Sequence, residues 1–317
     1  MPNNKQDLRG AKILVTGGAG FIGSHLVDKL ALENEVIVVD NLFTGSLSNL
    51  EKSKHRITFM NGDIRDKELM KDVVMKVEFV FHLAADVGNV RSIEDPLTNM
   101  DVNVRGTLNV LEACLSSNIV RFVYSASAAA YGEAEYLPID EDHPINPESP
   151  YAVSKLAAEK YAYAFYKIHG LPVTCLRYFN VYGPRQESSE YANVIPIFLK
   201  GIKEGKPLTI FGDGNQTRDF TFVGDIVRAN ILAATQSQAI GGIFNIATGK
   251  RTSVNELANL IEQVTGREVL TIHDKARTGE VRDSLANIGK AKKTLGYDPE
   301  TNFNEGLLST WKEVINE

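Results

Sequence analysis

The chain has 317 residues, of which 43% are hydrophobic and 23% charged, and its formal net charge is −6. These values are ordinary for a globular protein with one large domain or two smaller ones. They exclude an overall basic field for nucleic acid or for an anionic membrane surface. No apolar run approaches the length of about 18 residues that a membrane span needs. The histidines and cysteines do not cluster at the spacing of metal ligands.

The two cysteines, Cys114 and Cys175, each lie within an apolar segment. This is typical of buried thiols in a reducing compartment rather than of a disulfide framework. The N-terminal stretch MPNNKQDLRG is polar and has no apolar signal core. We therefore expect a cytoplasmic protein without a structural metal.

Short apolar runs alternate with amphipathic segments in the first 180 residues. The runs are rich in β-branched and aromatic residues and have the length of strands buried on both faces: 11–17, 35–40, 57–63, 79–85, 121–127 and 173–180. Segments such as 99–117 and 150–169 have helical length and composition. This alternation predicts an α/β fold with a doubly wound parallel sheet.

The sequence TGGAGFIGSHL directly follows the first predicted strand. Gly18, Gly20 and Gly23 satisfy G-x-G-x-x-G, and Gly17 adds an overlapping triplet with Gly20 and Gly23. Small residues let the backbone turn tightly and approach a pyrophosphate at the N-terminus of the next helix. Because a strand precedes the motif and a helix follows it, we predict a Rossmann-type dinucleotide site.

Asp40 closes the second predicted strand, 17 residues after Gly23 (40 − 23). A carboxylate at this strand end can accept both hydroxyls of an adenosine ribose and would repel a 2′-phosphate. The motif therefore favours NAD over NADP.

The stretch SPYAVSK, residues 149–155, places Tyr151 and Lys155 one helical turn apart. Such a pair alone most often serves packing or solubility. The stretch YSASAAAYG ends the preceding strand with the hydroxyls of Ser125 and Ser127, and Tyr151 follows Ser127 by 24 residues (151 − 127). Together, these side chains are candidates for a catalytic centre.

Beyond residue 180 the alternation becomes irregular, with Pro- and Gly-rich connections. A helix is predicted where Ser253 can act as N-cap, with Glu256 three residues later, followed by one apolar face of Leu257, Leu260, Ile261 and Val264. We expect a first domain over 1–180, to which the chain returns around 220–247, and a smaller α/β lobe over 181–317.

These features resemble the short-chain dehydrogenase/reductase superfamily, in its extended, nucleotide-sugar branch. The resemblance covers nearly the whole chain through GGAGFIGSHL, DNLFTG, GDIRD, FHLAA, NVRGTLNVLEAC, SPYAVSK, LRYFNVYGPRQ, GDGNQTRDFTFVGDIVRA and RTGEVRDSLANIGKAKKTLGY. It implies Tyr151 as proton acceptor and donor, with Lys155 as its cationic partner and Ser127 as the hydroxyl that bridges the sugar and Tyr151. Ser125 is the alternative to Ser127, because Ala126 interrupts the run of serines that is more common in the family.

A free tyrosine has a pKa of about 10 and is a poor base at neutral pH. The Lys155 ammonium and the positive charge of an oxidised nicotinamide both favour the phenolate, so we expect them to move the pKa of Tyr151 toward working pH.

The resemblance also implies a shell around NAD. Its members are Gly17, Gly20, Phe21, Ile22 and Gly23 at the glycine turn, Asp40, Asn41, Thr44 and Gly45 at the ribose, Asp63 and Ile64 at the adenine, Leu83, Ala84 and Ala85 along the dinucleotide, and Asn103, Ser125 and Tyr178 toward the nicotinamide.

A second implied shell would hold a UDP-sugar. Its members are Arg218, Arg277, Asn180 and Asn193 at the diphosphate, Glu280 (where Asp is more common) at a ribose, Phe211 at the base, and Ser284 beside the sugar's C2 substituent. Guanidinium groups suit phosphate because their planar fork donates two parallel hydrogen bonds.

The activity that the resemblance favours is a nucleotide-sugar 4-epimerase, in which C4 is oxidised to a ketone and reduced from the opposite face. A 4,6-dehydratase or decarboxylase is the alternative. Dehydratase relatives carry acidic residues directly after the catalytic hydroxyl, where this chain has Ala128, Ala129 and Ala130. A silent dinucleotide sensor would usually lack Tyr151 or Lys155.

Two finer expectations concern the substrate and the assembly. Ser284 is small, so the pocket should admit UDP-GlcNAc and UDP-GalNAc beside UDP-glucose and UDP-galactose, unless Ser284 only starts a turn and the pocket is closed elsewhere. Relatives commonly dimerise through helices that correspond to 99–117 and 150–169, so we expect a homodimer.

Overall fold

The computed structural model describes residues 7–186, 193–276 and 281–316. Its larger part is a sheet of seven strands in the order β11-β6-β5-β4-β1-β2-β3, with all neighbours parallel. The strands are β1 (Lys12–Thr16), β2 (Glu35–Asp40), β3 (Ile57–Asn61), β4 (Phe79–His82), β5 (Arg121–Ser127), β6 (Val173–Tyr178) and β11 (Ile243–Ile246). The predicted doubly wound parallel sheet is confirmed.

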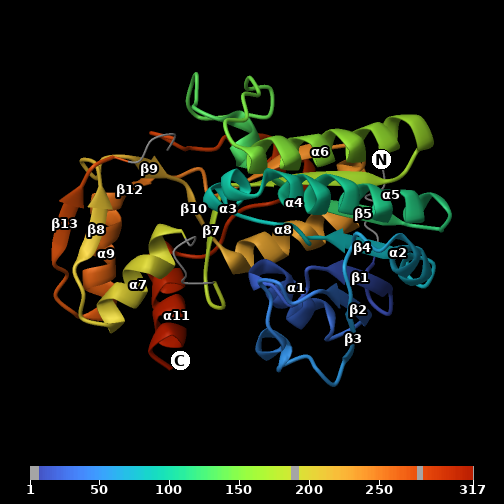
Figure 1. Ribbon diagram of the computed structural model, residues 1–317, viewed down its shortest axis with the longest axis horizontal. Helices are drawn as coiled ribbons and strands as arrows, with labels where there is room; N and C mark the ends of the chain where they lie inside the picture. The colour runs from blue at the N-terminus through green and yellow to red at the C-terminus, as the bar shows by residue number, and fades with distance from the viewer. Residues whose placement is uncertain (1–6, 187–192, 277–280, 317) are drawn as a thin grey trace.

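Successive strand residues point into two separate cores, one on each face of the sheet. In β1, Ile13 and Val15 belong to one core and Leu14 to the other. On the first face lie α1 (Phe21–Leu30), α8 (Val223–Thr235) and α10 (Gly289–Leu295). On the second face lie α2 (Lys67–Val74), α5 (Thr107–Leu115) and α6 (Pro150–His169). In Figure 1, α6 lies along the top of this larger part and α1 lies beside β1 and β2.

Strand β3 is the exception to the prediction that each strand is buried on both faces. None of its five residues is fully buried, whereas the central strand β4 is buried throughout. The reason is position, because β3 is the outermost strand of the sheet. The sequence pattern does not specify which strand takes the edge.

The segment predicted as one helix over 99–117 begins earlier and is not uniform. It consists of α4 (Pro96–Met100), a π-helical turn η2 (Asp101–Gly106) and α5. By contrast, α6 matches its predicted range. Ser149 caps its N-terminus by accepting a hydrogen bond from the Ala152 N–H, and Gly170 ends it in the left-handed conformation.

The smaller part lies beyond the carboxyl ends of the strands and has its own apolar core (Figure 1). It contains α7 (Val194–Lys203), α9 (Val254–Thr265), α11 (Phe303–Asn316) and the parallel pair β8 (Leu208–Phe211) and β13 (Thr271–Asp274). Helix α9 has the predicted capping box of Ser253 and Glu256.

Several shorter elements complete the described structure. They are the pairs β7 (Asn180–Tyr182) with β10 (Phe220–Phe222) and β9 (Thr217–Arg218) with β12 (Thr252–Ser253), the helix α3 (Asn89–Glu94), and the single turns η1 (Leu47–Leu50), η3 (Ala128–Tyr131) and η4 (Ser237–Ala239). The chain leaves the large sheet after β6, returns through α8 to β11, and leaves it again. The division at residue 180 stays a prediction.

Two findings concern only the described residues. Among them, no helix combines the length and the apolar character needed to cross a membrane. Within the same ranges, no group of three or more His, Cys, Asp or Glu side chains is arranged to hold a metal ion.

Candidate active site

The glycine turn after β1 can exist only with glycine at two positions. Gly17 has φ of +69°, and a Cβ there would lie 2.6 Å from the Ala84 backbone nitrogen. A Cβ on Gly23 would collide with the Gly17 carbonyl. Gly20 is the N-cap of α1, and a glycine N-cap leaves the first N–H groups of the helix for an anion. Phe21 and Ile22 begin the helix and pack against the core.

Asp40 ties the glycine turn to the loop that follows β2. It is nearly buried; Oδ2 accepts a hydrogen bond of 2.9 Å from the Ala19 N–H, and Oδ1 accepts one of 2.8 Å from the Leu42 N–H. A carboxylate has about four acceptor positions, so capacity remains for two ribose hydroxyls. Gly45 packs beside Ala19 and Asp40, while Asn41 and Thr44 are exposed on the same loop.

The predicted adenine residues, Asp63 and Ile64, have different surroundings. Asp63 accepts hydrogen bonds from Arg65 and from the Asn41 amide, and those from Arg65 lower its pKa to about 2. The Ile64 side chain is buried in the core, against Gly106.

The loop after β4 lies against the glycine turn. The Leu83 N–H donates to the Thr16 carbonyl at 3.1 Å, and the Ala84 N–H donates to the Thr16 hydroxyl at 3.3 Å. Leu83 and Ala84 pack on opposite cores, and Ala85 is partly buried. The carboxyl ends of β1 and β4, where the strand order reverses, therefore frame the predicted dinucleotide site.

Tyr151, Lys155 and Ser127 come together at the N-terminus of α6 and the end of β5. The Ser127 side chain lies close enough to the Tyr151 hydroxyl to favour its ionised form. Lys155 is buried, and its Nζ lies 4.6 Å from the centre of the Tyr124 ring. Of the two serines left open by the sequence, Ser127 is the one beside Tyr151, while Ser125 is buried two residues earlier on the strand.

The pKa shifts of Tyr151 and Lys155 do not follow the expectation that Lys155 lowers the pKa of Tyr151. Burial raises the pKa of Tyr151; the Ser127 side chain opposes this, and the Asp86 carboxylate adds to it. Burial also lowers the pKa of Lys155 to about 7, although Cys175 and Glu159 oppose the shift. In the chain alone, desolvation is thus the largest influence on the pKa of both groups.

Two residues predicted near the nicotinamide have their polar groups bonded within the protein. Tyr178 lies opposite Ser127 in the sheet register, but its hydroxyl donates to Asn230 of α8 at 2.9 Å. Asn103, in the π-helical turn, donates from Nδ2 to the Ser154 hydroxyl at 2.9 Å and to the Asp86 carbonyl at 3.0 Å. Both support the walls of the site.

The predicted substrate residues lie where the two parts of the molecule meet. Asn180 begins β7, Asn193 is the exposed N-cap of α7, and Phe211 ends β8. Arg218 donates from Nη1 to the Thr217 carbonyl at 2.9 Å, and the Ser284 N–H donates to the same carbonyl at 3.1 Å.

Arg218 and Ser284 are therefore neighbours, on adjacent segments. Asp219, next to Arg218, is buried and binds the N–H groups of Thr248, Gly249 and Ala286. These hydrogen bonds hold the segment of Arg218 against the segments that contain Thr248 and Ala286. Arg277 and Glu280 lie outside the described residues.

Sequence reasoning missed two buried polar groups around α6. The first consists of Asp86, Asn99, Asn103 and Ser154. The second is an ion pair between Glu159 and Arg177, with a 2.6 Å contact. The signal for both was a charged residue within or directly after a strand that is otherwise apolar.

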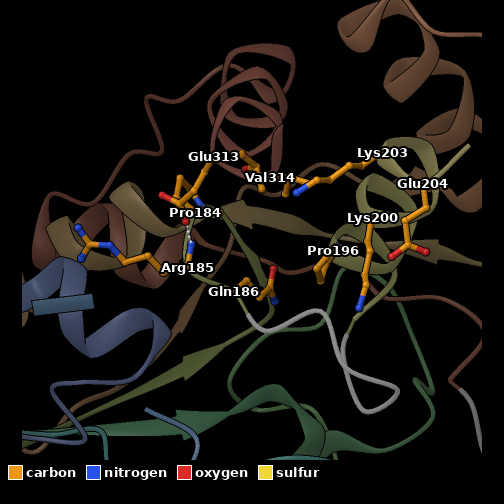
Figure 2. A pocket seen from close by; sticks show the side chains of 11 residues that line it. Pro184, Arg185, Gln186, Pro196, Lys200, Lys203, Glu204, Glu313 and Val314 are labelled. Atoms are coloured by element: carbon orange, nitrogen blue, oxygen red, sulfur yellow. Dashed lines mark hydrogen bonds between the residues drawn. The ribbon is translucent and has the colours of Figure 1, made fainter. Parts of the chain in front are cut away.

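A cavity of about 250 Å³ lies elsewhere, between α7, α11 and the segment after β7. Figure 2 shows Lys200 and Lys203 of α7 reaching toward it, with Glu313 and Val314 of α11 on another side. None of the predicted site residues lines this cavity.

Comparison with known proteins gives consistent matches. Residues 13–247 match the profile described as the NAD dependent epimerase/dehydratase family. A putative UDP-glucose 4-epimerase of Methanocaldococcus jannaschii is 46% identical over 96% of this chain and 97% of its own.

Two solved structures are similar over almost the full length. The UDP-N-acetylglucosamine 4-epimerase of Methanobrevibacter ruminantium, in complex with UDP-N-acetylmuramic acid, has a TM-score of 0.94 at 37% identity, covering 97% of this chain and 99% of its own. The UDP-glucose 4-epimerase of Thermotoga maritima, with UDP-glucose, has a TM-score of 0.91 at 40% identity, covering 95% and 98%.

Proposed function

The chain belongs to the NAD-dependent epimerase/dehydratase family, and on that premise we propose that it inverts C4 of a UDP-hexose through a transient 4-keto sugar. The observation that carries the proposal is the placement of Tyr151 beside Ser127, with Lys155 one turn further along α6. The relatives named above are UDP-glucose and UDP-N-acetylglucosamine 4-epimerases. We propose UDP-glucose and UDP-galactose, and the N-acetylated pair, as substrates.

In the proposed reaction, Tyr151 accepts the proton of the sugar's 4-hydroxyl and Ser127 holds the same oxygen by a hydrogen bond. When bound, NAD would supply the acceptor and the donor of the C4 hydride. Tyr151 then returns the proton to the oxygen at the inverted centre. Such chemistry depends mainly on positioning and on one tuned base.

The residues around the glycine turn fit NAD. The turn between Gly17 and Gly23 leaves no room for a Cβ at either position, as a close approach to pyrophosphate requires. The spare acceptor capacity of Asp40 suits ribose hydroxyls and opposes a 2′-phosphate. We propose that Asp40 and the turn hold the adenosine half, and that Lys155 holds the nicotinamide ribose.

The absence of proton-transferring side chains beside Ser127 supports epimerisation over dehydration. The three residues after Ser127 are Ala128, Ala129 and Ala130, which form the turn η3. A dehydratase needs an acid and a base near C5 and C6, and alanine provides neither.

We also propose a homodimer. Apolar side chains on α4 and α6 are exposed: Leu97 by 75%, Val153 by 51%, Tyr161 by 45% and Ile168 by 75%. Gathered on neighbouring helices, such side chains are typical of an interface. The two buried free thiols, Cys114 and Cys175, fit the expected cytoplasmic location.

The test is to incubate purified protein with each UDP-hexose without adding NAD, and to identify the products. Epimers at C4, formed without added cofactor, are expected because NAD is regenerated in every turnover. A dehydrated 4-keto sugar would instead indicate a dehydratase. No product, even with added NAD, would contradict the proposal and favour a sensor. The Tyr151→Phe variant is the control for contaminating activity.

A further inference from the structure

Asp86 is a buried carboxylate on the loop after β4, and no step of the proposed reaction uses it. Its side chain is almost fully enclosed. Oδ2 accepts a hydrogen bond of 3.0 Å from the Asn99 amide, while its main-chain N–H donates to Asn103 Oδ1 at 2.8 Å. Among the residues that the structure describes, Oδ1 has no hydrogen-bond partner. A buried carboxylate that accepts one side-chain hydrogen bond and otherwise has, within the described ranges, only the Arg91 cation near it is costly, so the arrangement calls for a reason.

A short chain of hydrogen bonds joins Asp86 to the first turn of α6. Asn99 accepts a hydrogen bond of 2.7 Å from the Ser154 hydroxyl, and Asn103 donates one of 2.9 Å to the same hydroxyl. The Ser154 hydroxyl also lies 3.0 Å from the Tyr151 carbonyl. The loop after β4, the π-helical turn and the catalytic turn of α6 are therefore held by one buried network.

Several charged or titratable groups surround the Tyr151 phenol. Asp86 on the loop after β4 and Tyr124 of β5 lie close enough to interact electrostatically with Tyr151, and Lys155 Nζ lies 4.6 Å from the centre of the Tyr124 ring. Arg91 of α3 forms an ion pair with Asp86, with Nη1 3.6 Å from Oδ1, and its positive charge partly offsets the negative charge of the carboxylate. The negative field of Asp86 opposes ionisation of Tyr151 and therefore raises its pKa.

We propose that Asp86 is a positioning residue of this enzyme: its carboxylate, through Asn99 and Ser154, and its main chain, through Asn103, fix the catalytic turn of α6, and its negative charge acts on the Tyr151 phenol. The inference rests on the proposed function, in which the same tyrosine must both accept and return a proton. A base and acid of this kind works best when its pKa is near the working pH. Asp86 would offset the acidifying effect of the oxidised nicotinamide.

The direct test measures the ionisation of Tyr151 without any sugar. The ultraviolet absorbance of phenolate is titrated against pH in NAD-loaded protein, and the titration of the Tyr151→Phe variant is subtracted to isolate this one group. With Asp86→Asn, which keeps an acceptor for Asn99 but removes the charge, the midpoint should fall by about one pH unit. Asp72→Asn, at an exposed site on α2, is the charge-matched control and should leave the midpoint unchanged.

A second measurement separates charge from anchoring. Ser154→Ala breaks the hydrogen-bond chain but keeps the Asp86 charge, so kcat should fall while the acidic limb of the kcat/KM profile stays in place. Asp86→Asn should move that limb to lower pH by the same amount as the titration. An unchanged Tyr151 midpoint in Asp86→Asn would overturn the role of the charge, and an unchanged kcat in Ser154→Ala would overturn the anchoring. Because the titration needs no turnover, it tests the effect of the Asp86 charge on Tyr151 even if no UDP-hexose is converted.

Discussion

Lys155 is buried and Tyr151 is partly buried, and desolvation acts against the charge of each of these proposed catalytic groups. The pKa of the Tyr151 phenol is raised, and that of the Lys155 ammonium is lowered to about 7. The base is therefore weak in the chain alone. The positive charge of an oxidised nicotinamide is the component that would favour the phenolate, so the geometry couples proton abstraction to a loaded cofactor.

Tyr151→Phe should lower turnover by about 10²–10⁴-fold, the range for loss of one acid–base group. The ring stays in place, so the melting temperature and NAD binding should change little. Steady-state kinetics on a UDP-hexose, with thermal unfolding and NAD titration as controls, would check this. Near-normal activity would indicate that Tyr151 and Lys155 serve packing rather than catalysis.

Asp40→Ala should weaken NAD binding strongly and reduce the preference of the protein for NAD over NADP. The change removes the ribose acceptors and frees the Ala19 and Leu42 N–H groups, which Asp40 binds. Calorimetric titration with NAD and NADP is the measurement. Unchanged affinity for NAD would show that this carboxylate does not contact the ribose.

Ser284→Tyr should abolish turnover of the N-acetylated sugars and spare UDP-glucose and UDP-galactose. Ser284 is nearly buried beside the segment of Arg218. A tyrosine there would overpack the wall only for the substrate that needs the extra space. A panel assay on both sugar pairs gives the answer. If the wild type ignores the N-acetylated pair, or the variant still converts it, Ser284 is not the size filter.

At the scale of elements, the sequence was informative where local chemistry decides the structure. Ser149, Pro150 and Gly170 specify both ends of α6, and Ser253 with Glu256 specifies the start of α9. The π-helical turn around Asn103 has no such local signature. It is stabilised by contacts with Asp86 and Ser154, which are distant in sequence, so only the folded chain reveals it.

His82 connects three elements and should make unfolding dependent on pH. The ring nitrogens lie 2.7 Å from the Thr16 hydroxyl of β1 and 2.9 Å from the Thr107 hydroxyl of α5. Burial, with a smaller effect of Lys155, lowers the pKa of His82 from 6.5 to about 3. Between pH 6.5 and about 3, His82 is therefore protonated in the unfolded chain and neutral in the folded chain.

The resulting stability is complete above pH 6.5 and is lost progressively as pH falls toward about 3, by about 1.4 kcal/mol for each pH unit. The melting temperature of His82→Gln should fall less steeply over this window than that of the wild type. Parallel curves for the two proteins would contradict the assignment, whatever their absolute stabilities.

At the scale of the whole molecule, the large sheet is completed by residues from far along the chain. Helix α8 covers one face through Ile226, Ala229 and Ala233, and β11 pairs with β6. The first six strands could be predicted from their apolar runs. The strand at the edge of the sheet could not be predicted, because the order of the strands is decided by packing across the entire sheet.

A fragment of residues 1–180 should therefore fail to fold cooperatively. It would expose the apolar face that α8 covers and leave β6 without a partner on one side. Thermal unfolding by circular dichroism, compared with the full chain, is the measurement. A monomeric fragment with a sharp transition would contradict this prediction, and a fragment extended to residue 247 is the comparison that restores both elements.

The late arrival of β11 also affects how the protein is made on the ribosome. Between the end of β6 at Tyr178 and the end of β11 at Ile246 the ribosome must add 68 residues (246 − 178). At about 5–20 residues per second, this takes about 3–14 s. During that interval the nascent chain carries a strand edge that its own later residues have yet to cover, which is when a chaperone or a neighbouring nascent chain would meet it.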